Sequence, residues 1–183
     1  MTNSMDRLDI PTLETERLRL RSFRKSDIDD YAALNADPEV QRYIGDGAVW
    51  DRGRSWRHLA FLVGHWYLGG AGTWAVEDRD TGEFVGKIGF SCPEGWPGFE
   101  LAWALVRSHW GRGYATEGAR AALDYAFDEL RQGHVISLIR PINAASIRVA
   151  ERLGERLEDT TRVAGVEYLV YGLDRSHYSA LAA

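Results

Sequence analysis

Cysteine, long apolar runs and an excess of positive charge are all scarce or missing in this sequence. Its single cysteine, Cys92, excludes an intrachain disulfide framework and a zinc site built from several cysteines. No apolar stretch reaches the roughly 18 residues that a membrane-spanning helix needs, and residues 1–12 lack the apolar centre of a signal peptide. We therefore expect a protein that stays in the cytoplasm and does not contact a membrane.

The charge balance is acidic, with 27 Asp and Glu residues against 22 Lys and Arg residues. This balance disfavours a general nucleic-acid binder, which would normally present a basic surface. A nucleic-acid module stays open only as an alternative, and a solvated helix face explains its basic run more simply. The arginines of that run are Arg140, Arg148, Arg152, Arg156 and Arg162. The five histidines form no H-E-x-x-H or comparable ligand pair, so no metal is expected.

What the sequence does contain is enough apolar material for a folded core. Hydrophobic residues make up 45% of the 183 positions and charged residues 27%, which is unlike a disordered chain. The length suits one globular domain, and there are no internal repeats or low-complexity linkers. We expect a single domain that spans residues 1–183.

Residue patterns predict both strands and helices. Alternating apolar and polar residues indicate a strand at 17–23, and three more β-like runs, separated by turn signals, indicate an antiparallel meander. The meander runs are 73–77, 83–91 and 99–106, and further strands follow at 134–140 and in the segment that ends at Asp174. One helix is expected to start at Ser26, and others to cover 54–65, 116–130 and 143–154. Glycines at 69, 70 and 72, at 133 and at 154 are expected to end these last three. This order predicts an α+β fold with a mixed, mostly antiparallel central sheet flanked by helices.

A glycine-rich turn at 106–118, between a strand and a long helix, is the segment most suggestive of chemistry. Gly111 and Gly113 can take backbone angles that let successive amides converge on an anion at the helix N-terminus. A nucleotide P-loop is excluded because Ala119 follows Gly118, and a dinucleotide fingerprint is excluded because Thr116 stands where glycine is needed. An ordinary strand-to-helix turn is the alternative.

The turn resembles the acetyl-CoA loop of the GCN5-related N-acetyltransferases (GNAT), which has the form Gln/Arg-x-x-Gly-x-Gly/Ala. Here it reads Trp-Gly-Arg-Gly-Tyr-Ala over 110–115, and the string W-G-R-G-Y-A-T-E looks like the RimJ/RimL branch of ribosomal-protein N-acetyltransferases. Three other segments match in the family's order, so the resemblance covers roughly residues 12–175. They are 15–21, 84–89 and the stretch from 143–146 through 152–154.

This resemblance implies the GNAT acyl-CoA N-acyltransferase fold, with acetyl-CoA as cosubstrate, and it assigns the cosubstrate's contacts. Backbone amides of the loop would hold the pyrophosphate, with the Thr116 hydroxyl close by, and the strand that ends at Leu105 and Val106 would bind the pantetheine arm. The loop residues are Trp110, Gly111, Arg112, Gly113, Tyr114 and Ala115. Asn143 would touch the CoA arm or the acceptor, and it is equally a good helix N-cap.

Acyl transfer to an amine needs a proton acceptor for the amine, and Glu100 on the central strand is the best candidate. Its alternative is an exposed or ion-paired strand carboxylate. Ala102 stands two residues later, where the resembled branch has glycine. The family's usual proton donor to sulfur is a tyrosine, but Ala150 occupies that position. The resembled branch implies Ser146 instead, acting directly or by ordering a water molecule; the alternative is an ordinary hydroxyl in the first turn of a helix.

The sequence therefore predicts an acetyl-CoA-dependent N-acetyltransferase, in which a primary amine attacks directly in a ternary complex. The acceptor is a protein N-terminus or a small-molecule amine, and the tryptophans before the meander could line its site, although plain core is the simpler interpretation. Two alternatives stay open: an amino-sugar or antibiotic acetyltransferase, and a CoA-binding sensor without catalysis. A homodimer is a family-level expectation.

Overall fold

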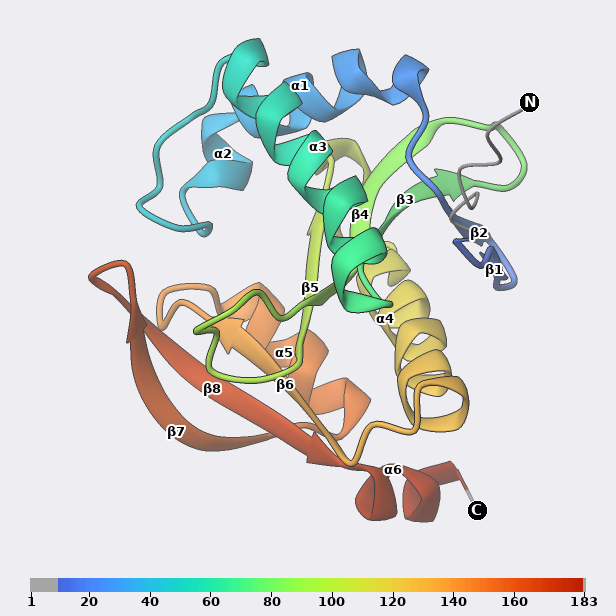
Figure 1. Ribbon diagram of the computed structural model, residues 1–183, viewed down its shortest axis with the longest axis vertical. Coiled ribbons are helices and arrows are strands. Elements are labelled where there is room, and N and C mark those ends of the chain that lie inside the picture. The colour runs from blue at the N-terminus through green and yellow to red at the C-terminus, as the bar shows by residue number, and fades with distance from the viewer. Residues whose placement is uncertain (1–9, 183) are drawn as a thin grey trace, which may run out of the picture.

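The computed structural model describes residues 10–182, which fold into a set of strands surrounded by helices (Figure 1). The strands are β1 (Leu13–Glu14), β2 (Leu18–Arg21), β3 (Thr73–Asp78), β4 (Phe84–Ser91), β5 (Glu100–Leu105), β6 (His134–Ile139), β7 (Arg156–Val163) and β8 (Val166–Asp174). The helices are α1 (Ile28–Ala36), α2 (Pro38–Gln41), α3 (Arg52–Gly69), α4 (Tyr114–Asp124), α5 (Ala144–Leu153) and α6 (Arg175–Ala182). Short helical turns are η1 (Lys25–Asp27), η2 (Arg107–His109) and the π-helical η3 (Tyr125–Glu129).

Within the described residues, the strands form one eight-stranded sheet in the order β1-β2-β3-β4-β5-β6-β8-β7. Every neighbouring pair is antiparallel except β5 and β6, which run parallel. The prediction of a mixed, mostly antiparallel sheet flanked by helices is confirmed.

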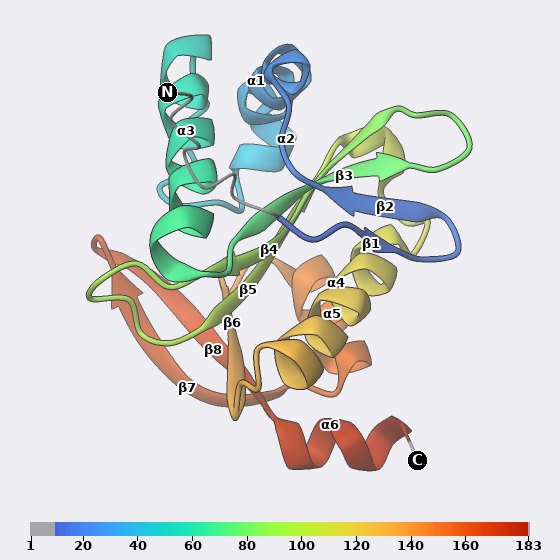
Figure 2. The ribbon, with the colours of Figure 1, turned by 45° about the vertical axis from the view of Figure 1, so that its right-hand side comes forward.

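Helices cover both faces of the sheet (Figure 2). On one face Ala104 of β5 packs with residues of α1, α2 and α3, among them Tyr31 and Leu62. On the other face the sheet packs against α4 in the larger core. That contact is close, because a Cβ added at Gly118 would lie 2.5 Å from Ile88 Cδ1. The central strands therefore have a closely packed helix on one side and a separate helical layer on the other.

The sheet opens between its two parallel strands. The registered pairing of β5 with β6 is Glu100 with Ile136, supported by a bond from the Ile136 amide to the Phe99 carbonyl (3.0 Å). Beyond this point β5 stays paired with β4, but β6 diverges from the other edge of β5. Near the branching point the Ser137 hydroxyl donates to the Leu101 carbonyl at 2.9 Å. The second half of β5 thus has one edge free for a ligand.

Some helix ends differ from the predictions for identifiable reasons. At the first helical segment the Asp27 carboxylate, in place of Ser26, accepts from a backbone amide, that of Arg24, at 2.6 Å. α3 begins earlier than predicted because the Asp51 side chain accepts from the Arg54 amide at 2.6 Å and so caps the helix. The long helix after the glycine loop ends before Gly133, because Arg131 already takes a left-handed φ of 56°.

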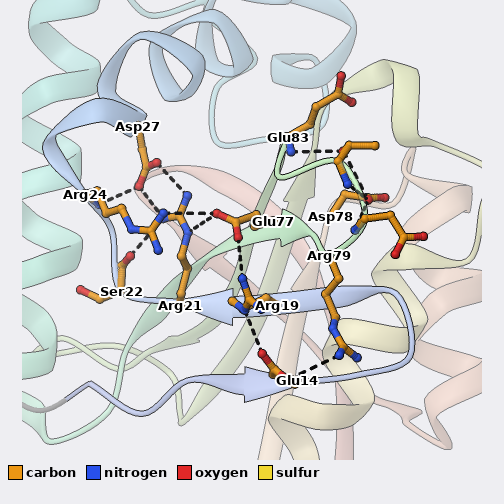
Figure 3. A network of polar contacts seen from close by, with 12 residues as sticks. Glu14, Arg19, Arg21, Ser22, Arg24, Asp27, Glu77, Asp78, Arg79 and Glu83 are labelled. Atoms are coloured by element: carbon orange, nitrogen blue, oxygen red, sulfur yellow. Dashed lines mark hydrogen bonds and ion pairs between the residues drawn. The ribbon is translucent and has the colours of Figure 1, made fainter.

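A polar network fastens β2 to β3 and to the start of the first helical layer (Figure 3). The buried Arg21 guanidinium pairs with both carboxylate oxygens of Asp27 (2.8 and 2.9 Å) and with Glu77 Oε2 (2.7 Å). Although burial opposes ionisation, the hydrogen bond from Arg21 keeps the pKa of Glu77 below its ordinary value. Because its carboxylates are paired, the network can lie inside the fold without an isolated charge.

Glu155, just before β7, is a buried carboxyl group with an incomplete set of partners. Its Oε1 lies 3.1 Å from the Ser137 hydroxyl oxygen, whose single proton goes to the Leu101 carbonyl, while Oε2 is sealed from solvent and has no partner among residues 10–182. Burial raises the pKa of Glu155 from 4.5 to about 8. The folded chain therefore keeps this proton at neutral pH, whereas the unfolded chain loses it.

Glu155→Gln is expected to stabilise the protein at pH 8 and to leave its stability at pH 4 nearly unchanged. Below pH 4.5 both the folded and the unfolded chain keep the Glu155 proton, so this group has no effect on stability. Above pH 4.5 the unfolded chain loses the proton while the folded chain keeps it, so the destabilisation by Glu155 grows until the pH reaches about 8. The free energy of unfolding at pH 8, from urea denaturation, should rise by at least about 1 kcal/mol. The exposed Glu151→Gln is the control. An unaltered slope of stability against pH would show that Glu155 does not hold its proton in the fold.

No helix within residues 10–182 has the length and apolarity that crossing a membrane requires.

Candidate active site

A cavity of about 510 Å³ lies where β5 parts from β6. Nine of the predicted site residues line it: Leu105, Trp110, Gly111, Gly113, Tyr114, Ala115, Thr116, Asn143 and Ser146. Val106, Arg112 and Glu100 are not part of its wall. The structure therefore brings most of the predicted loop together with the two predicted residues at the start of α5.

The glycine loop presents a row of unused backbone donors to this cavity. Gly111 and Gly113 have left-handed φ angles of 74° and 82°, which turn the chain into the N-terminus of α4. From 111 to 116, no backbone N–H donates to another group in the described part of the chain. Converging N–H groups at the positive end of a helix stabilise an anion. The loop can hold a phosphate group without any change in its own hydrogen bonds.

Thr15 and Arg17, which precede β2, hold this loop in place. The Arg17 guanidinium donates to the Arg112 carbonyl (2.9 Å) and pairs with the Glu117 carboxylate (2.5 Å). Glu117 also accepts from the Thr15 hydroxyl at 2.5 Å, and Arg17 lies over the ring of Tyr114. The two sequence motifs at 15–21 and 110–117 are thus in contact. They lie so far apart along the chain that no local pattern signals this pairing.

Trp110 has a structural role that its position in the motif does not reveal. Its indole N–H donates to the Leu105 carbonyl at 2.8 Å, and the Val106 amide donates to the Val85 carbonyl at 2.9 Å. The Leu105 carbonyl and the Val106 amide, at the predicted pantetheine contact, therefore already have partners within the protein.

Trp103 is the better placed residue of β5 for an amide-bearing ligand arm. The carbonyl of Phe99 faces β6. Backbone groups of successive residues point to opposite edges of a strand, so the N–H and C=O of Trp103, four residues further on, point to the same edge as those of Phe99. At Trp103 that side is the open edge, because the registered β5–β6 pairing is at Glu100. Trp103 also lines the cavity.

Two arginines of α5 add positive charge beside the loop. Arg148 and Arg152 are exposed residues one helical turn apart, and both line the cavity. The sequence pattern alone indicates only a solvated helix face. A cavity with open amides and two guanidinium groups suits a ligand that carries several negative charges.

Glu100 is buried at the start of β5, where β5 and β6 separate. Its Oε2 accepts from the Trp96 indole N–H at 2.7 Å. Burial raises the pKa of Glu100 to about 7, against the opposing effects of Trp96 and of the Lys87 charge. The alternative of an exposed strand carboxylate is wrong, since only 8% of the residue is exposed. A carboxyl group that titrates near neutral pH suits general base catalysis.

Ser146 lies in the first turn of α5, where one neighbour bonds its backbone amide and another bonds its hydroxyl. The Asn143 side chain accepts from the Ser146 amide (3.1 Å), so Asn143 caps the helix and lines the cavity at once. The Trp103 indole N–H donates to the Ser146 hydroxyl oxygen at 3.2 Å. The hydroxyl can therefore direct its own proton to a third group. Ala150, which replaces the family's tyrosine, is fully buried.

No group of three or more His, Cys, Asp or Glu side chains within residues 10–182 is arranged to hold a metal ion.

Comparison with known proteins decides the family. The model of the acetyltransferase (GNAT) domain matches residues 17–156, which is most of the chain. The chain belongs to the GNAT acetyltransferase family. The crystal structure of an acetyltransferase from Agrobacterium tumefaciens is 36% identical, with a TM-score of 0.81 over 90% of this chain and 95% of that one. The "Uncharacterized N-acetyltransferase p20" of Bacillus licheniformis is 30% identical over 82% of this chain and 85% of the relative.

This GNAT chain also shares its fold with an enzyme whose structure contains coenzyme A. RimL, described as a ribosomal L7/L12 α-N-protein acetyltransferase in complex with coenzyme A, gives a TM-score of 0.76 at 18% identity, covering 90% and 98% of the two chains. At that identity the likeness concerns the fold alone. The chain is an acetyltransferase, and its placement in the RimJ/RimL branch stays a prediction.

Proposed function

We propose that this GNAT enzyme transfers an acetyl group from acetyl-CoA to a primary amine by direct attack in a ternary complex. The acceptor is a small-molecule amine or a protein N-terminal α-amine. The observation that carries the proposal is the cavity at the open edge of β5, with unused loop amides at one end. The buried Glu100 stands at the start of the same strand. We further propose a single domain over 1–183, a cytoplasmic location and a homodimer.

The cavity residues fit acetyl-CoA. The amides of 111–116, with the Thr116 hydroxyl, would hold the pyrophosphate, and Arg148 and Arg152 would neutralise further phosphate charge. The backbone of Trp103 would bind the amides of the pantetheine arm. Acetyl-CoA supplies an activated acyl group, and the protein's own groups position it and manage two protons.

Transfer of an acyl group from a thioester to an amine forms a C–N bond and breaks a C–S bond. Glu100 would accept the proton that the attacking amine loses, directly or through water. Ser146 would donate a proton to the departing sulfur. Because a thiolate is a fairly good leaving group, with a pKa near 8.5, this second proton matters less than the first.

Ser146→Ala is expected to lower kcat by about tenfold or less, and to spare the affinity for CoA, because positioning supplies most of the rate. Trp103→Phe, which removes the indole donor to Ser146 while keeping an aromatic ring, should produce a similar loss. Steady-state kinetics with calorimetry of CoA binding measures both. A loss as large as that of Glu100→Gln would contradict the secondary role of this proton.

The direct test of the function is a thiol-release assay with acetyl-CoA against amines of several classes. The panel contains peptides with varied N-termini, amino acids, polyamines and aminoglycosides. Turnover that yields one free thiol for each acetylated amine supports the proposal. Tight CoA binding without turnover of any amine would overturn it.

A further inference from the structure

The face of β4 and β5 that points toward α1 and α3 carries small residues between two ionisable ones. Ala104 packs against this helical layer. Because side chains alternate along a strand, Ala102 and Glu100 point to the same face. Across the antiparallel ladder, Lys87 lies opposite Ala104 and Gly89 lies opposite Ala102. The face therefore presents Lys87 at one end, Glu100 at the other and very little side-chain volume between them.

This face keeps some solvent contact although it belongs to central strands. Ala102 and Lys87 both keep part of their accessible surface. The Lys87 ammonium forms no hydrogen bond or ion pair within residues 10–182. Two polar side-chain atoms in the described chain lack both solvent contact and a hydrogen-bond partner: Gln41 Oε1 and Glu155 Oε2. The Lys87 nitrogen has no hydrogen-bond partner and is not one of these two, so it is not completely shielded from solvent. The ammonium group is thus deeply buried but keeps some contact with solvent.

The charges near Lys87 make that end of the face positive. Burial lowers the pKa of Lys87 to about 8, while the Glu100 charge opposes this effect. His58 of α3 is neutral, because burial and the charges of Lys87 and Arg54 lower its pKa to about 3. No carboxylate of the described chain comes within ion-pair distance of Lys87. An unpaired, partly desolvated ammonium is unfavourable by itself and favours an anionic partner.

We propose that Lys87 binds a carboxylate of the acceptor while Glu100 receives the acceptor's amine, so the substrates are amines that also carry an acid group. This inference rests on the proposed function and names the substrate class of the same site. Lys87 and Glu100 are offset by about four residues along the ladder, or roughly 13 Å between backbones, before their side chains lean inward. Amino acids with a carboxylate several bonds from the amine fit this spacing.

The same arrangement works against polycationic acceptors. Lys87 would repel the second amine of a polyamine or an aminoglycoside, so unfavourable contacts contribute to specificity as well as favourable ones. Removing this charge should therefore change the preference between acceptors more than the overall rate.

The experiment compares kcat/KM for acceptors that differ only in charge. The pairs are L-glutamate with L-glutamine, and 6-aminohexanoate with its amide, and spermidine serves as the polycation. The wild-type protein is expected to prefer the carboxylate of each pair by at least about tenfold. Lys87→Gln should erase this preference, Lys87→Glu should shift it toward spermidine, and Lys87→Arg should retain it. Lys25→Gln, at an exposed lysine, is the matched control.

Two outcomes separate this inference from the function on which it rests. Equal turnover of both members of each pair by the wild-type protein would overturn the inference while leaving acetyl transfer intact. No turnover of any amine in the full panel would instead overturn the proposed function. The wild-type comparison needs no variant, so it decides the matter even if a Lys87 substitution prevents folding.

Discussion

Glu100→Gln is expected to lower kcat by about 10²–10⁴-fold, the range that a positioned general base contributes. The amide keeps the shape of the side chain but cannot accept the amine's proton. Affinity for CoA should be unchanged, because Glu100 is outside the cavity wall that we assign to CoA. The measurement is steady-state kinetics across pH values from about 5.5 to 9, with calorimetry of CoA binding alongside.

The pH profile identifies the role more sharply than the rate alone. The wild-type rate should rise with pH through about 7, where Glu100 loses its proton, and the variant should lack this limb. Burial makes the Glu100 charge unfavourable to folding above pH 4.5, so the variant should be no less stable at pH 8. Glu94→Gln, in the exposed loop before β5, is the control. A profile shared by wild type and variant would rule out Glu100 as the base.

Gly113→Val is expected to weaken CoA binding by about tenfold to a hundredfold. At a φ of 82° a β-branched residue is strained, and relief of about 1–3 kcal/mol of strain would rotate the loop amides away from the cavity. The dissociation constant for CoA, measured by calorimetry, reports the change.

A matched substitution separates strain from binding. Gly165, in the turn between β7 and β8, has a φ of 81° and open space around its Cβ position. Gly165→Val should therefore lower stability by a similar amount while leaving the CoA dissociation constant unchanged. If both variants bind CoA equally well, the glycine loop is not the phosphate site.

The elements whose signals are local could be predicted from the sequence. Alternation marks the meander of β3, β4 and β5, and the glycines at 111 and 113 mark the turn into α4. Gly154 ends α5 with a left-handed φ of 93°, as expected. These features depend on neighbours in the chain, which is why a single sequence displays them.

Contacts between distant segments could not be predicted in this way. The bond from the Arg17 amide to Glu117 joins residues 100 positions apart, and no spacing rule indicates it. The motif assigns Trp110 to the ligand, but the structure adds a second role: its indole N–H donates a hydrogen bond to the carbonyl of Leu105, the last residue of β5. Lys87 lies in the matched segment 84–89, but no sequence pattern assigns it a role. The cross-strand register places it on the face that holds Glu100.

The most direct test of the central claim is a two-dimensional ¹H–¹⁵N NMR titration of the protein with CoA. We expect the amide signals of 111–116 to show the largest shifts, since these N–H groups have no acceptor among residues 10–182 and would gain one in the complex. The Trp103 amide at the open edge of β5 should shift with them. Shifts confined to other segments, or no shifts at saturating CoA, would contradict the assignment of this cavity to acetyl-CoA.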